Sequence, residues 1–202
     1  MVFEVPDLEA ISANLRFDAV FHQHLHYYDL NSFITFGAHS GLEVNSFQRN
    51  PVGSNGGSLL VCLTRKSQVT RPAFELRPQA EAVDRKINRL RKQISRFESM
   101  MGLIREEIEE FPGPINIFGA ALMLSTLDYH LHRILSSRSL PVYDDDKSKD
   151  GLSYKNLSMT VSLPPHSLQN SMTIVGSLEN TRGIIRRCFD LGSSKVVAPF
   201  IT

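Results

Sequence analysis

The sequence has only two cysteines, no long apolar run and almost no net charge, and each absence excludes a class of protein. Cys62 and Cys188 match no metal-binding or redox spacing, so we expect reduced thiols. No apolar segment approaches the ~20 residues that span a bilayer. The first residues carry acids and lack the apolar stretch of a signal peptide. With a net charge of +1 and scattered basic residues, we expect no nucleic-acid or membrane partner and a cytoplasmic location.

Two nucleotide-binding signatures are also missing. The chain contains no G-x-x-x-x-G-K-[ST] segment, which argues against a P-loop NTPase. A dinucleotide fingerprint needs three glycines, and Phe118-Gly119-Ala120-Ala121 supplies only Gly119, so we expect neither NAD nor FAD. Small residues at this strand-to-helix junction are explained better by tight packing than by ligand contact.

The pattern before residue 80 mixes strands and short helices. Val2–Pro6 is expected to form the end of a strand, and Asp7 is suited to cap a helix that runs through Leu15. The run FDAVFHQHLHYYDL predicts a strand, and Asn31 is expected to cap a helix that stops at Gly41. Two further strands are predicted at 42–48 and 58–66.

A single long helix is predicted from Glu81 to Glu110, ended by Phe111-Pro112-Gly113-Pro114. Its apolar positions alternate four and three residues apart, and this seam is more typical of packing inside one chain than of a free coiled coil. The positions are Val83, Ile87, Leu90, Ile94, Phe97, Met101, Ile104 and Ile108.

Beyond Pro114, strands alternate with helices, which predicts a parallel sheet with right-handed crossovers. We expect strands in 115–121, 139–146, 157–164, 171–177 and 195–200, with helices through about Leu135 and in 179–192. The predicted fold is α/β: a Rossmann-like, mostly parallel sheet flanked by helices, preceded by a small α+β lobe and one long helix. The predicted parts are 1–80, 81–111 and 112–202.

The densest cluster of chemistry is His22-Gln23-His24-Leu25-His26-Tyr27-Tyr28. On a strand, His22, His24, His26 and Tyr28 would share one face, with Gln23 and Tyr27 on the other. Such histidines suit a zinc site or a general base, but companion metal ligands are hard to name, and a half-exposed strand with locally bonded imidazoles is the ordinary alternative. We therefore predict no metal.

Two loops complete the candidate residues. Asn55, Gly56, Gly57 and Ser58 precede a strand, where glycines let the backbone approach a phosphate, although an ordinary turn explains them as well. Asp144 stands at a strand's carboxyl end, with Lys149 following, a position that suits ribose hydroxyls or magnesium but equally a solvated turn.

Taken in order, these pieces resemble the C-terminal domain of S-adenosylmethionine-dependent C-methyltransferases that act on nucleotide-linked deoxysugars. That region opens with V-P-D, continues through F-D-x-I-Y-H-E-H-x-S-Y-F-S and H-G-G-S-x-R to a long helix, and ends with G-A-x-x-K-G and D-x-x-x-x-K-x-G. The matching residues begin at Val5-Pro6-Asp7, Phe17, Asn55, Gly119 and Asp144, covering nearly the whole chain.

The departures from the family pattern are chemical. Gln23 replaces the glutamate of the Glu-His pair that the family is thought to use for deprotonating the sugar, and an amide can neither accept that proton nor raise its neighbour's basicity. Asn55, Leu60 and Met123 replace a histidine, an arginine and a lysine. The family's donor-binding domain and its cysteine-rich zinc module are not present in this sequence.

The resemblance implies a substrate-side domain that is inactive alone and binds no cofactor itself, with S-adenosylmethionine held by a separate donor-binding domain or subunit. It implies His24 as the base, Gln23 and Tyr27 as its neighbours, and substrate contacts from His22, Asn55, Gly56, Gly57, Ser58, Gly119, Asp144 and Lys149. A nucleotide-linked deoxysugar is the implied ligand. Apolar surface exposed without the donor half predicts a homo-oligomer. The alternatives are a non-enzymatic assembly module and, more weakly, a zinc hydrolase.

Overall fold

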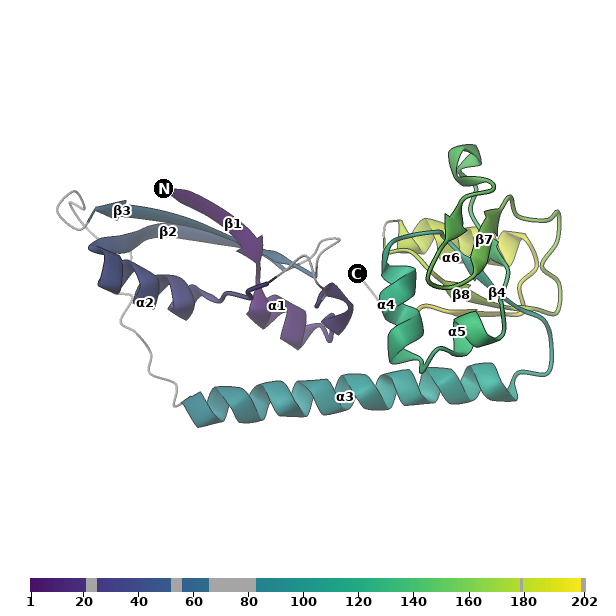
Figure 1. Ribbon diagram of the computed structural model, residues 1–202, viewed down its shortest axis with the longest axis horizontal. Coiled ribbons are helices and arrows are strands. Elements are labelled where there is room, and N and C mark those ends of the chain that lie inside the picture. Colours follow the sequence, from purple (N-terminus) through teal and green to yellow (C-terminus); the bar gives the residue numbers. More distant parts are fainter. Residues whose placement is uncertain (21–24, 52–55, 66–82, 179, 201–202) are drawn as a thin grey trace. The chain divides into compact units, whose positions relative to one another are not determined.

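A computed structural model of the chain describes residues 1–20, 25–51, 56–65, 83–178 and 180–200 (Figure 1). The chain divides into two compact units, Met1–Phe97 and Glu98–Thr202, and the division falls inside the long helix α3 (Val83–Glu110). Each unit contains its own sheet, one antiparallel and one mostly parallel. The fold is therefore α/β, as the alternation of strands and helices predicts.

Unit 1 is a three-stranded antiparallel sheet with a helix on one face. The strands are β1 (Val2–Pro6), β2 (Leu42–Asn50) and β3 (Ser58–Arg65), in the order β1-β3-β2. The central strand buries every second side chain, as a strand covered on one side must. Helix α2 (Leu30–Ser40) contributes Phe33 to the core formed with Val44, Leu59, Val61 and Leu63.

In the described residues 17–20 and 25–30, the prediction of a strand is wrong, and residues 21–24 lie outside the described residues. Phe17–Ala19 forms a 3₁₀ helix, in which the Val20 amide donates to the Phe17 carbonyl at 3.0 Å. The Phe17 ring packs on Phe97 of α3 with centroids 5.5 Å apart, which turns this segment toward the helix. Among residues 25–30, only Tyr28 makes a β-bridge, and it pairs with Asp7. An alternating pattern has the same appearance whether or not neighbouring strands are available to pair with it.

Helix α1 (Leu8–Ala13) is capped by Asp7, as predicted, whereas α2 is capped by Asp29 and not by Asn31. The Asp29 carboxylate accepts from the Ser32 amide at 2.8 Å, and the Ser32 hydroxyl completes a capping box. Gly41 ends α2 with a φ of 66°, a left-handed conformation that glycine adopts without strain. Asp29 is the cap because it has the extended backbone of an N-cap residue, whereas Asn31 already lies within the helix. Its buried carboxylate also binds Lys86.

Helix α3 confirms the predicted long helix but divides its apolar seam. Phe97, Met101 and Ile108 are buried, whereas Ile87 and Ile94 remain about two-fifths exposed, at 40% and 41%. The seam therefore packs within the chain toward the C-terminal end of the helix and stays partly open to solvent before it.

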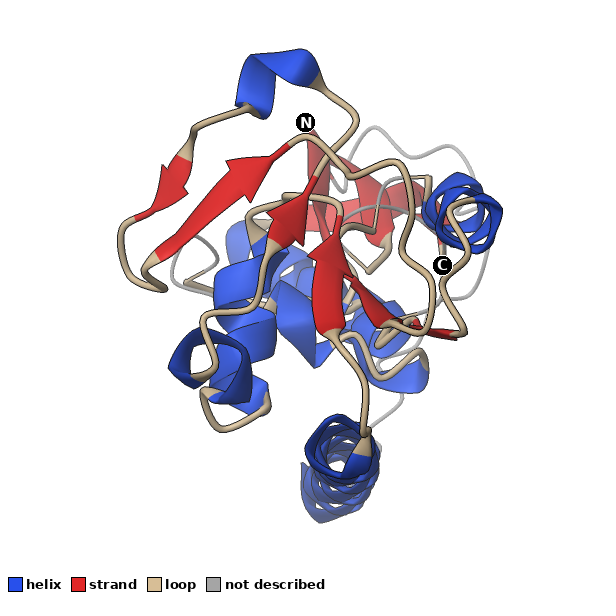
Figure 2. Cartoon of the chain, turned by 90° about the vertical axis from the view of Figure 1, so that its right-hand side faces the viewer, coloured by secondary structure: helices blue, strands red, loops and turns tan. Residues whose placement is uncertain are grey.

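Unit 2 contains a six-stranded sheet in the order β6-β7-β5-β4-β8-β9. Figure 2 draws the strands of the chain in red and its helices in blue. The β6–β7 pair is antiparallel, and the other neighbours are parallel, so the sheet is Rossmann-like. The strands are β4 (Ile115–Phe118), β5 (Val142–Tyr143), β6 (Ser153–Tyr154), β7 (Met159–Ser162), β8 (Met172–Val175) and β9 (Lys195–Val197). Strand β6 was not anticipated, because a two-residue pairing leaves no periodicity in the sequence.

The predicted helix through Leu135 is two helices, α4 (Met123–His130) and α5 (Ile134–Ser137). His132 and Arg133 have φ values of 55° and 62° and interrupt it. Buried Asp128 stabilises the break, because its carboxylate accepts from the amide and hydroxyl of Ser136 at 3.0 and 2.7 Å. Helix α6 (Thr181–Asp190) follows β8. None of the helices in the described ranges combines the length and apolar character needed to cross a bilayer.

Candidate functional site

Three separate motifs of unit 1 meet at Asp7. The Asp7 amide donates to the Gly57 carbonyl at 3.1 Å, and the next amide, of Leu8, donates to the Tyr28 carbonyl at 3.0 Å. The end of β1, the end of the histidine-rich run and the start of β3 therefore adjoin. These are the V-P-D, HQHLHYY and G-G-S segments, which lie up to 50 residues apart in the sequence.

The Asp7 carboxyl group is buried and incompletely satisfied. Its Oδ1 accepts from the Glu9 amide at 3.0 Å, which caps α1. Its Oδ2 lies 3.3 Å from an Arg49 guanidinium nitrogen but has no partner with hydrogen-bond geometry among the described residues. Burial raises the pKa of Asp7 above its ordinary value, and the charge of Arg49 only partly opposes this. This junction thus contains a carboxyl oxygen with unused acceptor capacity.

The two glycines of the loop are required for packing. A Cβ on Gly57 would lie 2.7 Å from the Ala10 Cβ and 2.9 Å from the Asn50 carbonyl oxygen, and one on Gly56 would lie 3.0 Å from the Arg16 Cβ. Their φ values of 117° and 78° also favour glycine. The side of these residues where a side chain would stand is occupied by the chain itself, so packing alone accounts for both glycines. Ser58 follows them as the first residue of β3 and pairs with Pro6.

The tyrosines of the histidine-rich run have structural contacts. The Tyr27 hydroxyl donates to the Ala19 carbonyl at 3.2 Å, and the Tyr28 ring packs against Phe33 with centroids 5.4 Å apart. The His26 ring lies 6.1 Å from Tyr28, so these two residues remain neighbours although they are not on a strand. The predicted site residues His22, Gln23, His24 and Asn55 lie outside the described residues.

The sequence reasoning missed two charged residues beside this junction. Asp29 follows Tyr28 directly, is fully buried and forms an ion pair with Lys86 of α3. Burial alone would raise the pKa of Asp29, but hydrogen bonds from Lys86 and Ser32 outweigh it and lower that pKa below its ordinary value. The guanidinium group of Arg49 forms ion pairs with the carboxylates of both Asp7 and Glu9. An aspartate before a helical run is a recognisable cap signal, whereas nothing local marks Arg49.

In unit 2, the strands that follow β4 are added first on its β5 side and then, from β8 onward, on its other side. Rossmann-like folds place their ligands at such a reversal of strand order. Here the loops that follow β4 and β8 pack on each other. A Cβ on Gly119 would lie 2.8 Å from the Ser177 Cβ, and one on Gly176 would lie 2.5 Å from the Gly119 carbonyl oxygen. Gly119 therefore serves the close approach of two loops, the alternative that the sequence favours for it.

Asp144 and Lys149 come together after β5, and they bind the chain's own backbone. Asp144 Oδ2 accepts from the Ala120 amide at 2.8 Å and from Lys149 Nζ at 2.9 Å, while Lys149 also donates to the Ala120 carbonyl at 3.1 Å. Burial alone would raise the pKa of Asp144, but these bonds and one from the Asp146 amide lower it. The two residues hold the loop after Gly119 in place.

Neighbouring groups extend this polar contact. The Tyr154 hydroxyl donates to the Ala121 carbonyl at 3.0 Å, and burial together with Asp144 raises the pKa of Tyr154 to about 12. Arg187 of α6 binds Asp145 through two hydrogen bonds of 3.2 and 3.3 Å. Cys62 and Cys188 are free thiols, and burial raises the pKa of Cys188 to about 12, which makes it a poor nucleophile.

Among the described residues, no three histidine, cysteine or acidic side chains are grouped as a metal site would require. No protein-family model matches the chain, and a search of curated proteins gave no match.

Proposed function

We propose that this chain is the substrate-side domain of a methyltransferase-like protein that acts on nucleotide-linked deoxysugars, and that it is inactive without a separate donor-binding domain or subunit. The observation that carries this proposal is the meeting of Asp7, Tyr28 and Gly57 at one junction in unit 1, where the V-P-D segment and the histidine-rich run end and the G-G-S segment begins β3. A shared ligand gives a reason for three such segments to adjoin.

The proposed chemistry assigns a role to each group. The imidazole of His24 takes the proton from the carbon beside the sugar's keto group, and the resulting enolate carbon attacks the methyl group of S-adenosylmethionine, releasing S-adenosylhomocysteine. The donor is held by the partner domain, so this chain binds no cofactor. Gln23 lacks the carboxylate that would strengthen the base, and we expect slow turnover even in a complete assembly.

Side-chain NMR of the histidines tests substrate binding directly. Titration with a nucleotide-linked keto-deoxysugar should shift the resonances assigned to His22 and His24 by substitution. His39, which lies on the exposed side of α2 and contacts the Thr35 carbonyl, is the internal reference and should not move. If no histidine resonance moves at millimolar ligand, the substrate-binding proposal is rejected.

Calorimetry with S-adenosylmethionine tests the other half of the proposal. The isolated chain should show no binding, because the donor site belongs to another domain. Micromolar binding, about −8 kcal/mol, would contradict the assignment as a substrate-side domain.

A second candidate function is a non-enzymatic assembly module. Three predicted substrate contacts, Asp144, Lys149 and Gly119, are instead occupied by contacts within unit 2, and this favours the assembly module. This reading keeps the fold and uses the exposed part of α3 for association. The weaker zinc-hydrolase alternative rests on the histidine cluster His22, His24 and His26. Metal analysis of protein purified without added zinc would test it.

A further inference from the structure

Helix α3 is the covalent connection between the two units. The division falls between Phe97 and Glu98, so the chain passes from one unit to the other once, inside this helix. The N-terminal part of α3 is attached to unit 1, because Lys86 forms an ion pair with Asp29 and the ring of Phe97 packs on that of Phe17.

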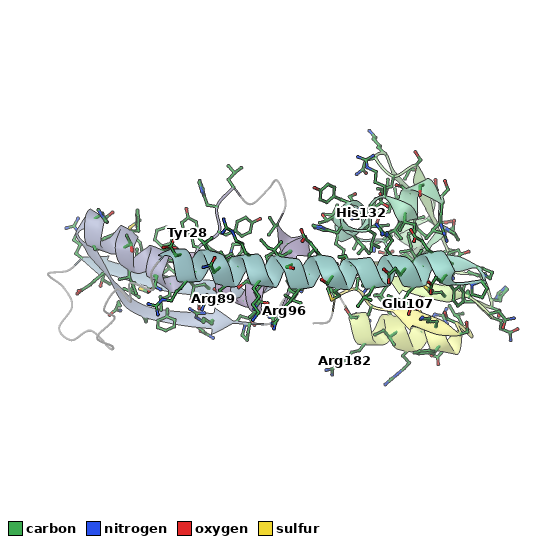
Figure 3. All side chains as sticks on the ribbon, turned by 90° about the horizontal axis from the view of Figure 1, so that it is seen from below. Tyr28, Arg89, Arg96, Glu107, His132 and Arg182 are labelled. Carbon is green, nitrogen blue, oxygen red and sulfur yellow. The ribbon has the colours of Figure 1, made fainter. Side chains whose placement is uncertain are left out.

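The C-terminal part of α3 is attached to unit 2. Glu107 forms an ion pair with Lys195 of β9, and Arg138 Nη1 donates to the Ile108 carbonyl at 3.0 Å. In Figure 3, Glu107 lies on the C-terminal half of the helix. The two ends of α3 are therefore anchored to different units, and any change in the orientation of one unit against the other must act on the turns between these anchors.

Residues 99–102, directly after the division, have a composition that suits bending. Their sequence is Ser-Met-Met-Gly. Serine and glycine are weaker helix formers than alanine, and sharp bends in helices are found where they occur together. Methionine is unbranched and repacks easily, and Met101 is buried, so its side chain can adapt to a change in the direction of the helix. We call residues 99–102 the hinge turn.

Gly102 of the hinge turn is not required for packing. A Cβ there would meet nothing within 4 Å, and its φ is not in the left-handed region. The other glycines inside the described helices have close neighbours: a Cβ on Gly37 would lie 3.0 Å from the Leu42 carbonyl oxygen, and one on Gly183 would collide with the Asn180 side chain. A glycine inside a helix lowers stability relative to alanine. Gly102 has this cost without a packing reason for it.

From these observations we infer that α3 is a hinge, which bends at residues 99–102 and thereby changes the orientation of unit 1, with its Asp7 junction, against unit 2. Hinges are a few residues, often small ones, that absorb changes in φ and ψ. Here they lie directly after the division, between parts of one helix that are anchored to different units. The inference is independent of the proposed function.

Residual dipolar couplings of the full chain in a weakly aligned sample test the hinge, because they give an alignment tensor for each unit separately. In the native chain the tensors of the two units should differ in magnitude, since a bending helix averages the orientation of one unit against the other. In Gly102→Ala the two tensors should become more alike, because alanine favours the straight helix and its methyl group has room.

Amide hydrogen exchange measures the same change locally. In an α-helix the amides of residues 103–106 donate to the carbonyls of residues 99–102, so bending at the hinge turn exposes them. In Gly102→Ala these amides should exchange about fivefold more slowly than in the native chain, the factor that corresponds to the preference for alanine over glycine inside a helix.

Asn88→Ala is the matched control, because Asn88 is an exposed residue of the same helix in unit 1 and alanine improves helix propensity there as well. It should slow exchange only around residue 88 and leave the two tensors as different as in the native chain. The inference is overturned if the native units share one alignment tensor, if Gly102→Ala leaves their difference unchanged, or if Asn88→Ala removes it equally. The native measurement requires no variant, so poor folding of Gly102→Ala would not leave the hinge untested.

Discussion

The two units differ in how many charged side chains they bury. Unit 1 buries Asp7, Arg16 and Asp29 almost completely, close to the segments that meet at Asp7. In the described part of unit 2, only Asp128 and Cys188 are ionisable side chains buried to this degree. Both carboxylate oxygens of Asp128 are hydrogen-bonded to Ser136. The other buried polar groups of unit 2 are hydroxyls and one amide. Burying a charge costs stability unless partners compensate for it fully.

This difference indicates where ligand chemistry belongs. Asp144 and Lys149 of unit 2 reach solvent in part and are satisfied by the backbone that they hold. Among the described residues, both units contain buried polar atoms without a hydrogen bond: Asp7 Oδ2 and Thr64 Oγ1 in unit 1, and Arg105 Nε and Asn116 Oδ1 in unit 2. Asp7 is the one carboxyl group among them, and its pKa is raised. Departures from full satisfaction are expected where a protein binds or reacts, because elsewhere selection has no reason to retain their cost. The comparison therefore favours unit 1 as the location of the proposed substrate contacts.

The largest expected effect is at Gly57. Gly57→Ala should destabilise unit 1 by about 3 kcal/mol or more, because a positive φ is strained and the new Cβ would collide with Ala10 and a backbone oxygen. Gly151 of unit 2 also has a positive φ, of 80°, but a Cβ there would meet nothing within 4 Å, so Gly151→Ala should cost only about 1 kcal/mol. Urea unfolding of the two variants measures both. Equal losses would mean that Gly57 is not packed as described.

An intermediate effect is expected at the lysines of two Asp–Lys ion pairs. Lys86→Ala leaves the fully buried Asp29 without its cation and should cost about 2 kcal/mol. Lys149→Ala leaves Asp144 with backbone donors and partial access to water, so about 1 kcal/mol is expected. Arg85→Ala, on the exposed side of α3, is the control and should change stability by less than about 0.5 kcal/mol. If Lys149→Ala lowered the free energy of unfolding more than Lys86→Ala does, the comparison of the two units would be reversed.

The smallest effect is a pH dependence of opposite sign in the two units. Because the folded pKa of Asp7 is raised, folding favours its protonated form, and native stability falls as pH rises from about 4 through that pKa. The folded pKa of Asp144 is lowered, so its contribution is complete above about pH 4 and is lost as pH falls through the folded value. Each dependence should amount to roughly 1 kcal/mol or less.

Tm measurements of D7N and D144N against the native chain between pH 3 and 7 separate the two cases. D7N should gain stability relative to the native chain as pH rises, since it no longer buries a charge. D144N should be less stable than the native chain at neutral pH, with the difference shrinking below pH 4. The same sign in both variants would show that the two carboxyl groups are in equivalent environments.

Much of the fold could be read from local patterns. Alternating burial in β3, the four-and-three spacing of α3 and the alternation of strands with helices beyond Pro114 all follow from the periodicity of one element packing on a core. The cap at Asp7 is equally local, since it concerns a side chain and an amide two residues away.

What the tertiary structure alone decided depends on contacts between distant residues. The segment from Phe17 alternates like a strand, but Phe17–Ala19 forms a 3₁₀ helix, and the Phe17 ring packs on Phe97. In the sequence, Gly119 resembles part of a ligand-binding loop, but in the folded chain Ser177 packs beside it, 2.8 Å from where a Cβ would stand. The meeting of Gly57 and Tyr28 at Asp7 has no local signal either. Periodicity records which side of an element is buried, and only the folded chain determines what that side is buried against.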